Sequence, residues 1–270
     1  MRATIWGCRG SLATPGASTV RYGGNTTSVE LRTSTGGLIV LDAGTGIRAL
    51  GLSLAREHPP QIHLLLTHMH LDHVEGLGFF APLFDPACTI TIWGPRPDNL
   101  PLRDHLAAYL SPPLFPVPFE RFPSTIEFVE VREDAWEMDG VRIRSAPVRH
   151  PGPTVGYRIE ENGNSLAFIP DNEPALEADS GLALAAGVDL LLHDAQYTAE
   201  EYATRAGWGH TAIPDFASYV REAAPSRTVM FHHDPSHTDE ELEAMEQTAR
   251  ELVGLETVDL AREGVEIAIE

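Results

Sequence analysis

Residues 67–73, with the sequence THMHLDH, place four side chains that can bind a metal ion in one short segment: His68, His70, Asp72 and His73. The apolar run 62–66 directly before them is typical of a buried strand. A loop at the carboxyl end of a strand is open to solvent while its base is rigid, so chemistry is common there in α/β folds. As a solvated loop the segment would need no cation, but if it is buried its imidazoles and carboxylate would repel and desolvate one another. The segment therefore predicts a cation site, and this ligand set suits Zn²⁺.

Composition and net charge limit which kinds of molecule the protein is expected to bind. The chain has 270 residues, of which 43% are hydrophobic, and no uninterrupted apolar run reaches the roughly 18 residues that a membrane span needs. We therefore expect no membrane partner. The net charge of −20 opposes the approach of long polyanions, so we expect no nucleic-acid groove. A small anionic substrate remains compatible with this charge, because bound cations would make the pocket locally positive. Cys8 and Cys88 form no CxxC pair, and without a secretion signal they predict free thiols in the cytoplasm.

The hydrophobic pattern alternates between strands and helices along the chain. Strands are predicted at 2–8, 28–34, 37–42, 61–66, 89–93, 125–131, 140–148, 154–160, 164–170, 188–193, 227–232 and 265–269. Helices are predicted at 47–56, 102–110, 178–186, 211–224 and 238–253. The two sheet-plus-helix halves are similar in size, and no linker separates them. We therefore expect one domain over residues 1–270, of the α/β (α+β) class, built as a four-layer αββα sandwich.

A proline-rich insert at about 95–123 interrupts this alternation. Its run PPLFPVPF, residues 112–119, is apolar but cannot form regular structure, because proline lacks the N–H donor. Two interpretations remain open. The run packs on the surface, or it forms a stiff lid or pocket wall beside the metal-binding loop.

Three later segments end an apolar strand with a potential ligand, as the first segment does. These are VRHPGP with His150, FIPDN with Asp171, and MFHHD with His232 and His233. Taken alone, a histidine or aspartate at a strand end is more often a cap or a solvated side chain. Together with the first cluster, the three segments predict that strand ends meet at a site for two metal ions.

This pattern resembles the metallo-β-lactamase fold superfamily, because THMHLDH matches its HxHxDH motif at every metal-binding position. The resemblance extends from Asp42, which looks like the supporting aspartate of the first motif, to His232. It implies that one metal is held by His68, His70 and His150, and the second by Asp72, His73 and His232. Asp171 would bridge the two ions.

The choice of His232 over its neighbour His233 rests on position. His232 follows its strand as His68 follows Leu66, with Phe231 in the place of Thr67. The next side chain of a strand-end loop points elsewhere, so we expect only one of the two adjacent histidines to reach a metal.

Charge bookkeeping favours a phosphodiester substrate. Two Zn²⁺ ions bring four positive charges, whereas the two aspartates and a bridging hydroxide bring three negative charges. The remaining single positive charge suits a monoanion. Metals roughly 3.5–4 Å apart activate water and stabilise the attacking and leaving oxygens. Mn²⁺ or iron could replace zinc, although iron-binding members of the superfamily typically carry glutamate where His70 stands.

Two further segments, LHDAQY at 192–197 and WGHTA at 208–212, resemble the ribonuclease-Z-like phosphodiesterase branch. The resemblance implies that Asp194 orients His210, which donates a proton to the leaving oxygen. A carboxylate fixes the tautomer of an imidazole and raises its pKa, so the pairing is chemically sensible. The alternative is that His210 only starts a helix and Asp194 is a turn acid. His193 is either a support of the centre or purely structural.

The opening motifs WGCRGS and RYGGNTTS also resemble this branch, and HPGP, PDNEP, HDAQY and FHHDP resemble an uncharacterised bacterial group within it. The chain lacks the long glycine- and proline-rich arm with which ribonuclease Z grips transfer RNA. That departure, with the acidic charge, weighs against transfer-RNA processing.

Three functions remain in view. The leading hypothesis is a dinuclear zinc hydrolase that cleaves a small phosphodiester, such as a cyclic nucleotide, through metal-bound hydroxide with Asp72 accepting its proton. The same ligands would serve a lactone, thioester or amide hydrolase. A non-catalytic metal-binding sensor module is the third. The pair of His210 and Asp194 favours the phosphodiesterase, and a homodimer is possible.

Overall fold

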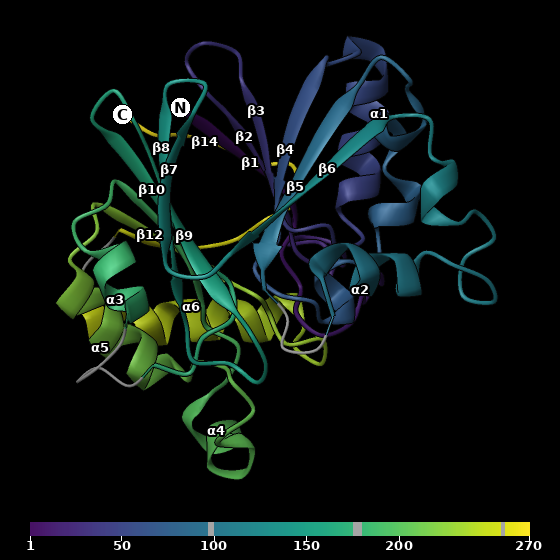
Figure 1. The fold of residues 1–270 in the computed structure, drawn as a ribbon. Helices are drawn as coiled ribbons and strands as arrows, with labels where there is room; N and C mark the ends of the chain where they lie inside the picture. Colours follow the sequence, from purple (N-terminus) through teal and green to yellow (C-terminus); the bar gives the residue numbers. More distant parts are fainter. Residues whose placement is uncertain (97–99, 175–179, 255–256) are drawn as a thin grey trace.

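The structure is a computed structural model that describes residues 1–96, 100–174, 180–254 and 257–270. Two seven-stranded sheets pack face to face, and helices cover the outer face of each sheet (Figure 1). The predicted four-layer αββα sandwich of mixed α and β class is confirmed. Among the described helices, none is long and apolar enough to span a bilayer.

The first sheet has the order β14-β1-β2-β3-β4-β5-β6. Its strands are β1 (Arg2–Gly7), β2 (Ser28–Arg32), β3 (Leu38–Leu41), β4 (Gln61–Leu65), β5 (Thr89–Pro95), β6 (Thr125–Val131) and β14 (Glu266–Ala268). Strands β3 to β6 run parallel, so their carboxyl ends lie at one edge of the sheet. This edge carries the first metal-binding segment, which continues from β4 into the 3₁₀ turn η1 (Leu71–His73).

The second sheet has the order β13-β12-β11-β10-β9-β8-β7. Its strands are β7 (Asp134–Met138), β8 (Val141–Pro147), β9 (Val155–Glu161), β10 (Asn164–Ile169), β11 (Leu190–Asp194), β12 (Arg227–Phe231) and β13 (Val258–Leu260). Strands β10 to β13 are parallel, and β8 points the same way because β9 is antiparallel to both β8 and β10. The three later ligand segments follow β8, β10 and β12, so they leave the sheet at a common edge.

The helices are α1 (Ile47–Glu57), α2 (Leu102–Tyr109), α3 (Ser180–Ala185), α4 (Ala199–Arg205), α5 (Ile213–Ala223) and α6 (Asp239–Val253). In addition to η1, the described chain contains the short 3₁₀ turns η2 (Leu77–Phe79), η3 (Ala81–Phe84) and η4 (Phe119–Arg121). Helices α1 and α2 cover the first sheet, whereas α3, α5 and α6 cover the second (Figure 1). Helix α4 projects away from both sheets.

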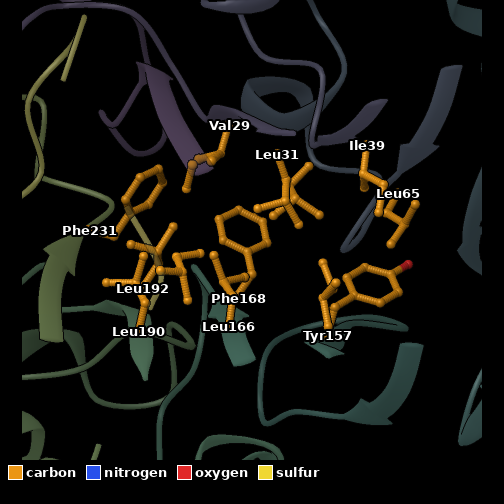
Figure 2. Packing of buried hydrophobic residues seen from close by; sticks show 14 of the residues in the cluster. Val29, Leu31, Ile39, Leu65, Tyr157, Leu166, Phe168, Leu190, Leu192 and Phe231 are labelled. Carbon is orange, nitrogen blue, oxygen red and sulfur yellow. The ribbon is translucent and has the colours of Figure 1, made fainter. Parts of the chain in front are cut away.

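The main core lies between the two sheets, where apolar side chains of both inner faces meet (Figure 2). It includes Val29, Leu31, Ile39, Leu65, Tyr157, Leu166, Phe168, Leu190, Leu192 and Phe231. Burying each large apolar side chain contributes roughly 1.5–3 kcal/mol. The Tyr157 hydroxyl crosses this interface and donates to the Leu66 carbonyl oxygen at 2.6 Å. The sheets are therefore fixed to each other directly beside the end of β4.

The sequence pattern missed three elements. Strand β13 has only three residues, and β7 is mostly exposed, so neither gives a clear apolar signal. Helix α4 buries no residue, but it begins with a capping box of Thr198 and Glu201 that the sequence does display. The helix predicted at 178–186 is found at Ser180–Ala185, and residues 178 and 179 lie outside the described part of the chain.

The proline-rich insert packs its aromatic side chains into the helical layer of the first sheet. Phe115, Phe119 and Phe122 are buried there, whereas Leu114 is 72% exposed. The Tyr109 hydroxyl donates to the carbonyl oxygen of Glu75 at 2.7 Å. The insert is thus tied to the segment that directly follows the metal-binding loop, and its role as a lid stays a prediction.

Candidate metal centre

Three imidazoles converge in a first group at the facing ends of the two sheets. His68 and His70 come from the loop after β4, and His150 follows β8. The Nε2 atom of His150 lies 3.0 Å from Nδ1 of His70, and one ring nitrogen of each residue lies within 4.8 Å of the others. These are the three residues predicted to hold one metal.

A second group joins the same loop to the end of β12. The Nε2 atom of His232 lies 3.1 Å from Asp72 Oδ2 and 3.3 Å from His73 Nε2. His73 Nε2 lies 3.2 Å from the same Asp72 oxygen. These three donor atoms come from the residues predicted to hold the second metal.

Asp171 lies between the two groups and presents one carboxylate oxygen to each. Its Oδ1 atom lies 3.2 Å from His73 Nε2 and 3.3 Å from His232 Nε2. Its Oδ2 atom lies 3.6 Å from His68 Nε2 and 3.7 Å from His150 Nε2. The structure therefore brings all seven predicted ligands together, with the carboxylate in the position that a bridge requires.

Unpaired buried atoms show that this cluster fits metal ions. His68 Nε2 and Asp171 Oδ1 are buried without a hydrogen-bond partner among the described residues. An unsatisfied buried polar atom costs about 1–3 kcal/mol. A divalent cation would accept lone pairs from both atoms, so the donor set suits zinc in chemical type and in number.

The electrostatics of the cluster lead to the same conclusion. Burial lowers the pKa of His68 well below its ordinary value and also lowers the pKa of His150, so both imidazoles are neutral and offer a lone pair. Burial opposes a charge on His73, but the Asp171 and Asp72 carboxylates raise its pKa. Burial alone would raise the pKa of Asp171, yet the surrounding histidines hold it well below its usual range. These buried carboxylates need positive charge beside them.

The two adjacent histidines after β12 point to different sides. The His232 side chain lies in the cluster, and its Nδ1 donates to Gln196 Oε1 at 2.8 Å. His233 instead donates from Nε2 to the carbonyl oxygen of Ala261 at 3.0 Å. Gly10 lies against the His232 ring, since a Cβ atom there would come within 2.3 Å of His232 Nδ1. Only His232 is therefore placed to contact a metal.

Asp42 accepts hydrogen bonds that hold the first metal-binding loop in place. One of its carboxylate oxygens accepts from the Thr67 backbone N–H at 2.7 Å. The other accepts from the Thr67 hydroxyl at 2.9 Å and from His73 Nδ1 at 2.8 Å. These bonds fix the His73 tautomer, so that its Nε2 faces the centre.

Asp194 and His210 form the predicted pair beside the second group. The His210 Nδ1 atom donates to Asp194 Oδ2 at 2.9 Å, and the His210 ring stacks on His232 with centroids 4.9 Å apart. The Asp194 carboxylate also accepts from the backbone N–H groups of Asn172 and Gln196. Burial alone would lower the pKa of His210, but Asp194 raises it above its ordinary value. An imidazole held in this way can donate a proton near neutrality.

His193 faces away from the centre. Its side chain is fully buried, contacts the Tyr219 ring at a tilt of 37° with centroids 4.2 Å apart, and donates from Nδ1 to the Asp194 carbonyl oxygen at 2.8 Å. Of the two interpretations of this residue, the geometry favours the structural one.

Sequence reasoning missed two groups that touch the predicted ligands. The backbone N–H of Ser11 donates to Asp72 Oδ2 at 2.7 Å, and Gln196 orients His232. A backbone donor leaves no trace in a sequence. Gln196 lies two residues after Asp194 in the HDAQY motif, so its position in that motif was the available signal.

Comparison with known proteins identifies the class. A model of the beta-lactamase superfamily domain matches residues 38–233, and the chain belongs to this superfamily. Ribonuclease Z of Mycobacterium bovis (strain BCG / Pasteur 1173P2) is 32% identical over 223 residues, which cover 74% of each protein.

Solved structures share the fold over the whole chain. The metallo-beta-lactamase fold protein YhfI from Bacillus subtilis gives a TM-score of 0.74 at 17% identity, with 99% of both chains covered. The short form of human tRNase Z gives a TM-score of 0.73 at 18% identity, with 100% of both chains covered. The protein is a metal-dependent hydrolase with the metallo-β-lactamase fold, related to ribonuclease Z.

Proposed function

We propose that this protein is a dinuclear zinc phosphodiesterase that acts on a small phosphodiester, such as a cyclic nucleotide. The single observation that carries the proposal is the placement of Asp171. Its two carboxylate oxygens face two separate groups of three donors, at 3.2–3.3 Å on one side and 3.6–3.7 Å on the other. His68, His70 and His150 would hold one ion, and Asp72, His73 and His232 the other. The same donors would also hold Mn²⁺ or iron.

Bound zinc would supply Lewis acidity and a nucleophile from water at neutral pH. The protein residues then orient and move protons. Asp72, held by the Ser11 N–H at 2.7 Å, would steer the attacking water and accept its proton. His210, held by Asp194 at 2.9 Å, would donate a proton to the leaving oxygen as its bond to phosphorus breaks.

The substrate class follows from charge and from the relatives. The curated relatives are named ribonuclease Z, and RNA cleavage breaks the same class of bond, a phosphodiester. The net charge of −20 opposes the approach of a long polyanion, which favours a small substrate over RNA. We propose a cytoplasmic enzyme without a nucleic-acid groove, and a homodimer that light scattering would detect.

The test combines metal analysis with a substrate panel. Purified protein loaded with zinc is expected to contain two ions per chain by plasma mass spectrometry and to hydrolyse bis(p-nitrophenyl) phosphate and a cyclic nucleotide. Lactones, thioesters, amides and RNA form the rest of the panel. Turnover of one of these classes without turnover of the phosphodiesters would overturn the proposed substrate. A protein that binds zinc but hydrolyses nothing would instead favour a sensor module.

The proton-donor role predicts a selective effect of His210→Ala. Removing a general acid costs about 10²–10⁴-fold in rate, so turnover of the cyclic nucleotide should fall by that factor. Zinc content should remain that of the wild type, because the seven predicted ligands are untouched. Unchanged turnover in this variant would remove His210 from the mechanism.

A further inference from the structure

We propose that Glu173 is a positioning residue that sets the proton donor His210 through the backbone of Gly209. This inference rests on the proposed phosphodiesterase function. Glu173 follows the bridging Asp171 by two residues and is only 4% exposed. Its backbone N–H donates to the Arg149 carbonyl oxygen at 2.8 Å, which joins the loops after β10 and β8.

The Glu173 carboxylate accepts three hydrogen bonds from the segment that carries α4. It accepts from the Tyr202 hydroxyl at 2.6 Å, from the Gly207 N–H at 2.8 Å and from the Gly209 N–H at 3.0 Å. Helix α4 projects from the body of the protein (Figure 1) and buries none of its own residues. The carboxylate therefore attaches this projecting segment to the loop that carries Asp171.

Glycine is required for this attachment at both backbone contacts. Gly207 has a φ of 86° and Gly209 a φ of 91°, a region that other residues rarely adopt. This backbone path lets two N–H groups face one carboxylate. At Gly209 a Cβ atom would also lie 2.3 Å from Nδ1 of His150, so the chain passes directly against a predicted metal ligand.

The backbone of Gly209 connects Glu173 to the centre through its two flanking peptide groups. On one side its N–H binds the Glu173 carboxylate; on the other its carbonyl oxygen accepts from His150 Nδ1 at 2.9 Å. The next residue is His210. A displacement of the Gly209 backbone would therefore move the backbone of the proton donor.

The two flanks of His210 are held differently. After His210, the Thr211 carbonyl oxygen accepts from the Tyr197 N–H at 3.1 Å, which pairs this flank with the segment that follows β11. Asp194 holds the ring itself. Before His210, the Gly209 N–H is held by the Glu173 carboxylate and the Gly209 carbonyl oxygen by His150. Glu173 thus supplies the negatively charged anchor on the flank that lacks regular pairing.

A change at Glu173 should therefore impair proton donation rather than zinc binding. Glu173→Gln keeps the size of the side chain, but an amide offers only one acceptor oxygen, so it cannot satisfy both glycine N–H groups as the carboxylate does. The matched control is Glu200→Gln, which makes the same chemical change at an exposed position of α4. Tyr202→Phe is a milder second variant, because it removes only the hydroxyl donor.

The experiment compares two leaving groups with zinc-loaded protein. A p-nitrophenolate leaves readily without a proton, whereas the alkoxide released from a cyclic nucleotide needs one. We expect Glu173→Gln to lower kcat for the cyclic nucleotide by roughly 10–100-fold, the usual effect of losing a supporting hydrogen bond. For bis(p-nitrophenyl) phosphate we expect a change of less than about threefold, since general acid catalysis contributes little there. Zinc content should stay close to that of Glu200→Gln, whereas Tm should fall modestly below that of the control, because one buried N–H loses its acceptor.

A double variant tests whether Glu173 acts through His210. Glu173→Gln combined with His210→Ala should turn over the cyclic nucleotide as slowly as His210→Ala alone, because residues that act as a unit are not additive. Independent, multiplied effects would overturn the proposal. So would equal slowing of both substrates, or loss of zinc, since either would make Glu173 a structural support. If the wild type hydrolyses no phosphodiester, the proposed function itself fails.

Discussion

The two halves of the sandwich contribute to the metal centre in different ways. The first half supplies His68, His70, Asp72 and His73 from one loop of six residues after β4. The second half supplies one ligand from each of three strand ends, at His150, Asp171 and His232. The loop can thus present its donors within a local turn, whereas the other three depend on the register of a whole sheet.

This difference shows how the centre acquires two sites. Neither group of donors is made by one half alone. His150 completes a group begun by His68 and His70, and His232 completes a group begun by Asp72 and His73. The contact between the sheets, through the core in Figure 2, is therefore what brings each group to three donors.

The largest expected loss of zinc and activity distinguishes a ligand that faces both donor groups from a ligand that belongs to only one. Asp171→Asn removes a charge that faces both groups, so we expect both zinc ions to be lost and kcat/KM to fall by roughly three orders of magnitude, because bound metals supply several kcal/mol of transition-state stabilisation. His70→Ala should instead cost one ion, because its Nδ1 belongs to a single group. Plasma mass spectrometry distinguishes the two results. Equal zinc loss in both variants would contradict the bridging position.

A smaller effect tests the end of β12, where identical neighbours have different roles. His232→Asn should remove the second ion and reduce turnover by about 10²-fold, the penalty for a misplaced catalytic group. His233→Asn should leave the zinc content and turnover unchanged. It should lower the free energy of unfolding by only about 1–2 kcal/mol, since it weakens one buried hydrogen bond to Ala261. Zinc loss in the His233 variant would reverse this assignment.

The smallest expected effect tests the close contact between the Gly209 backbone and the predicted metal ligand His150. Gly209→Ala and Gly163→Ala both place a side chain at a left-handed position, with φ of 91° and 89°, which costs about 1–2 kcal/mol. Only the Cβ atom at Gly209 would meet another residue, the His150 ring at 2.3 Å; nothing lies within 4 Å at Gly163. Thermal unfolding should shift in both variants, and further in Gly209→Ala because of this clash, whereas activity should fall, by roughly tenfold or more, only in Gly209→Ala. Equal activities would show that the His150 ring moves aside freely.

Much of the fold was predictable because apolar periodicity reports burial directly. Strands β4 and β11 are buried on both faces along most of their length, as the runs at 62–66 and 188–193 suggested. Strand β7 was not predictable, since an edge strand with exposed side chains carries little periodic signal. Helix α4 was not predicted for a similar reason. It packs no side chain into the core, so its capping box was its sole sequence signal.

The sequence by itself determined the chemical identity of the donors and their place at strand ends. Four of them were readable at once, because they are neighbours along the chain. The sequence favoured His232 over His233 by its place after the strand, but the tertiary structure decided the choice, since it depends on the backbone turn after β12 and on contacts with Gly10 and Gln196. It also decided that one carboxylate, Asp171, faces both groups. The physical reason is that a distance between residues far apart in sequence is set by how two sheets pack, and no local pattern encodes it.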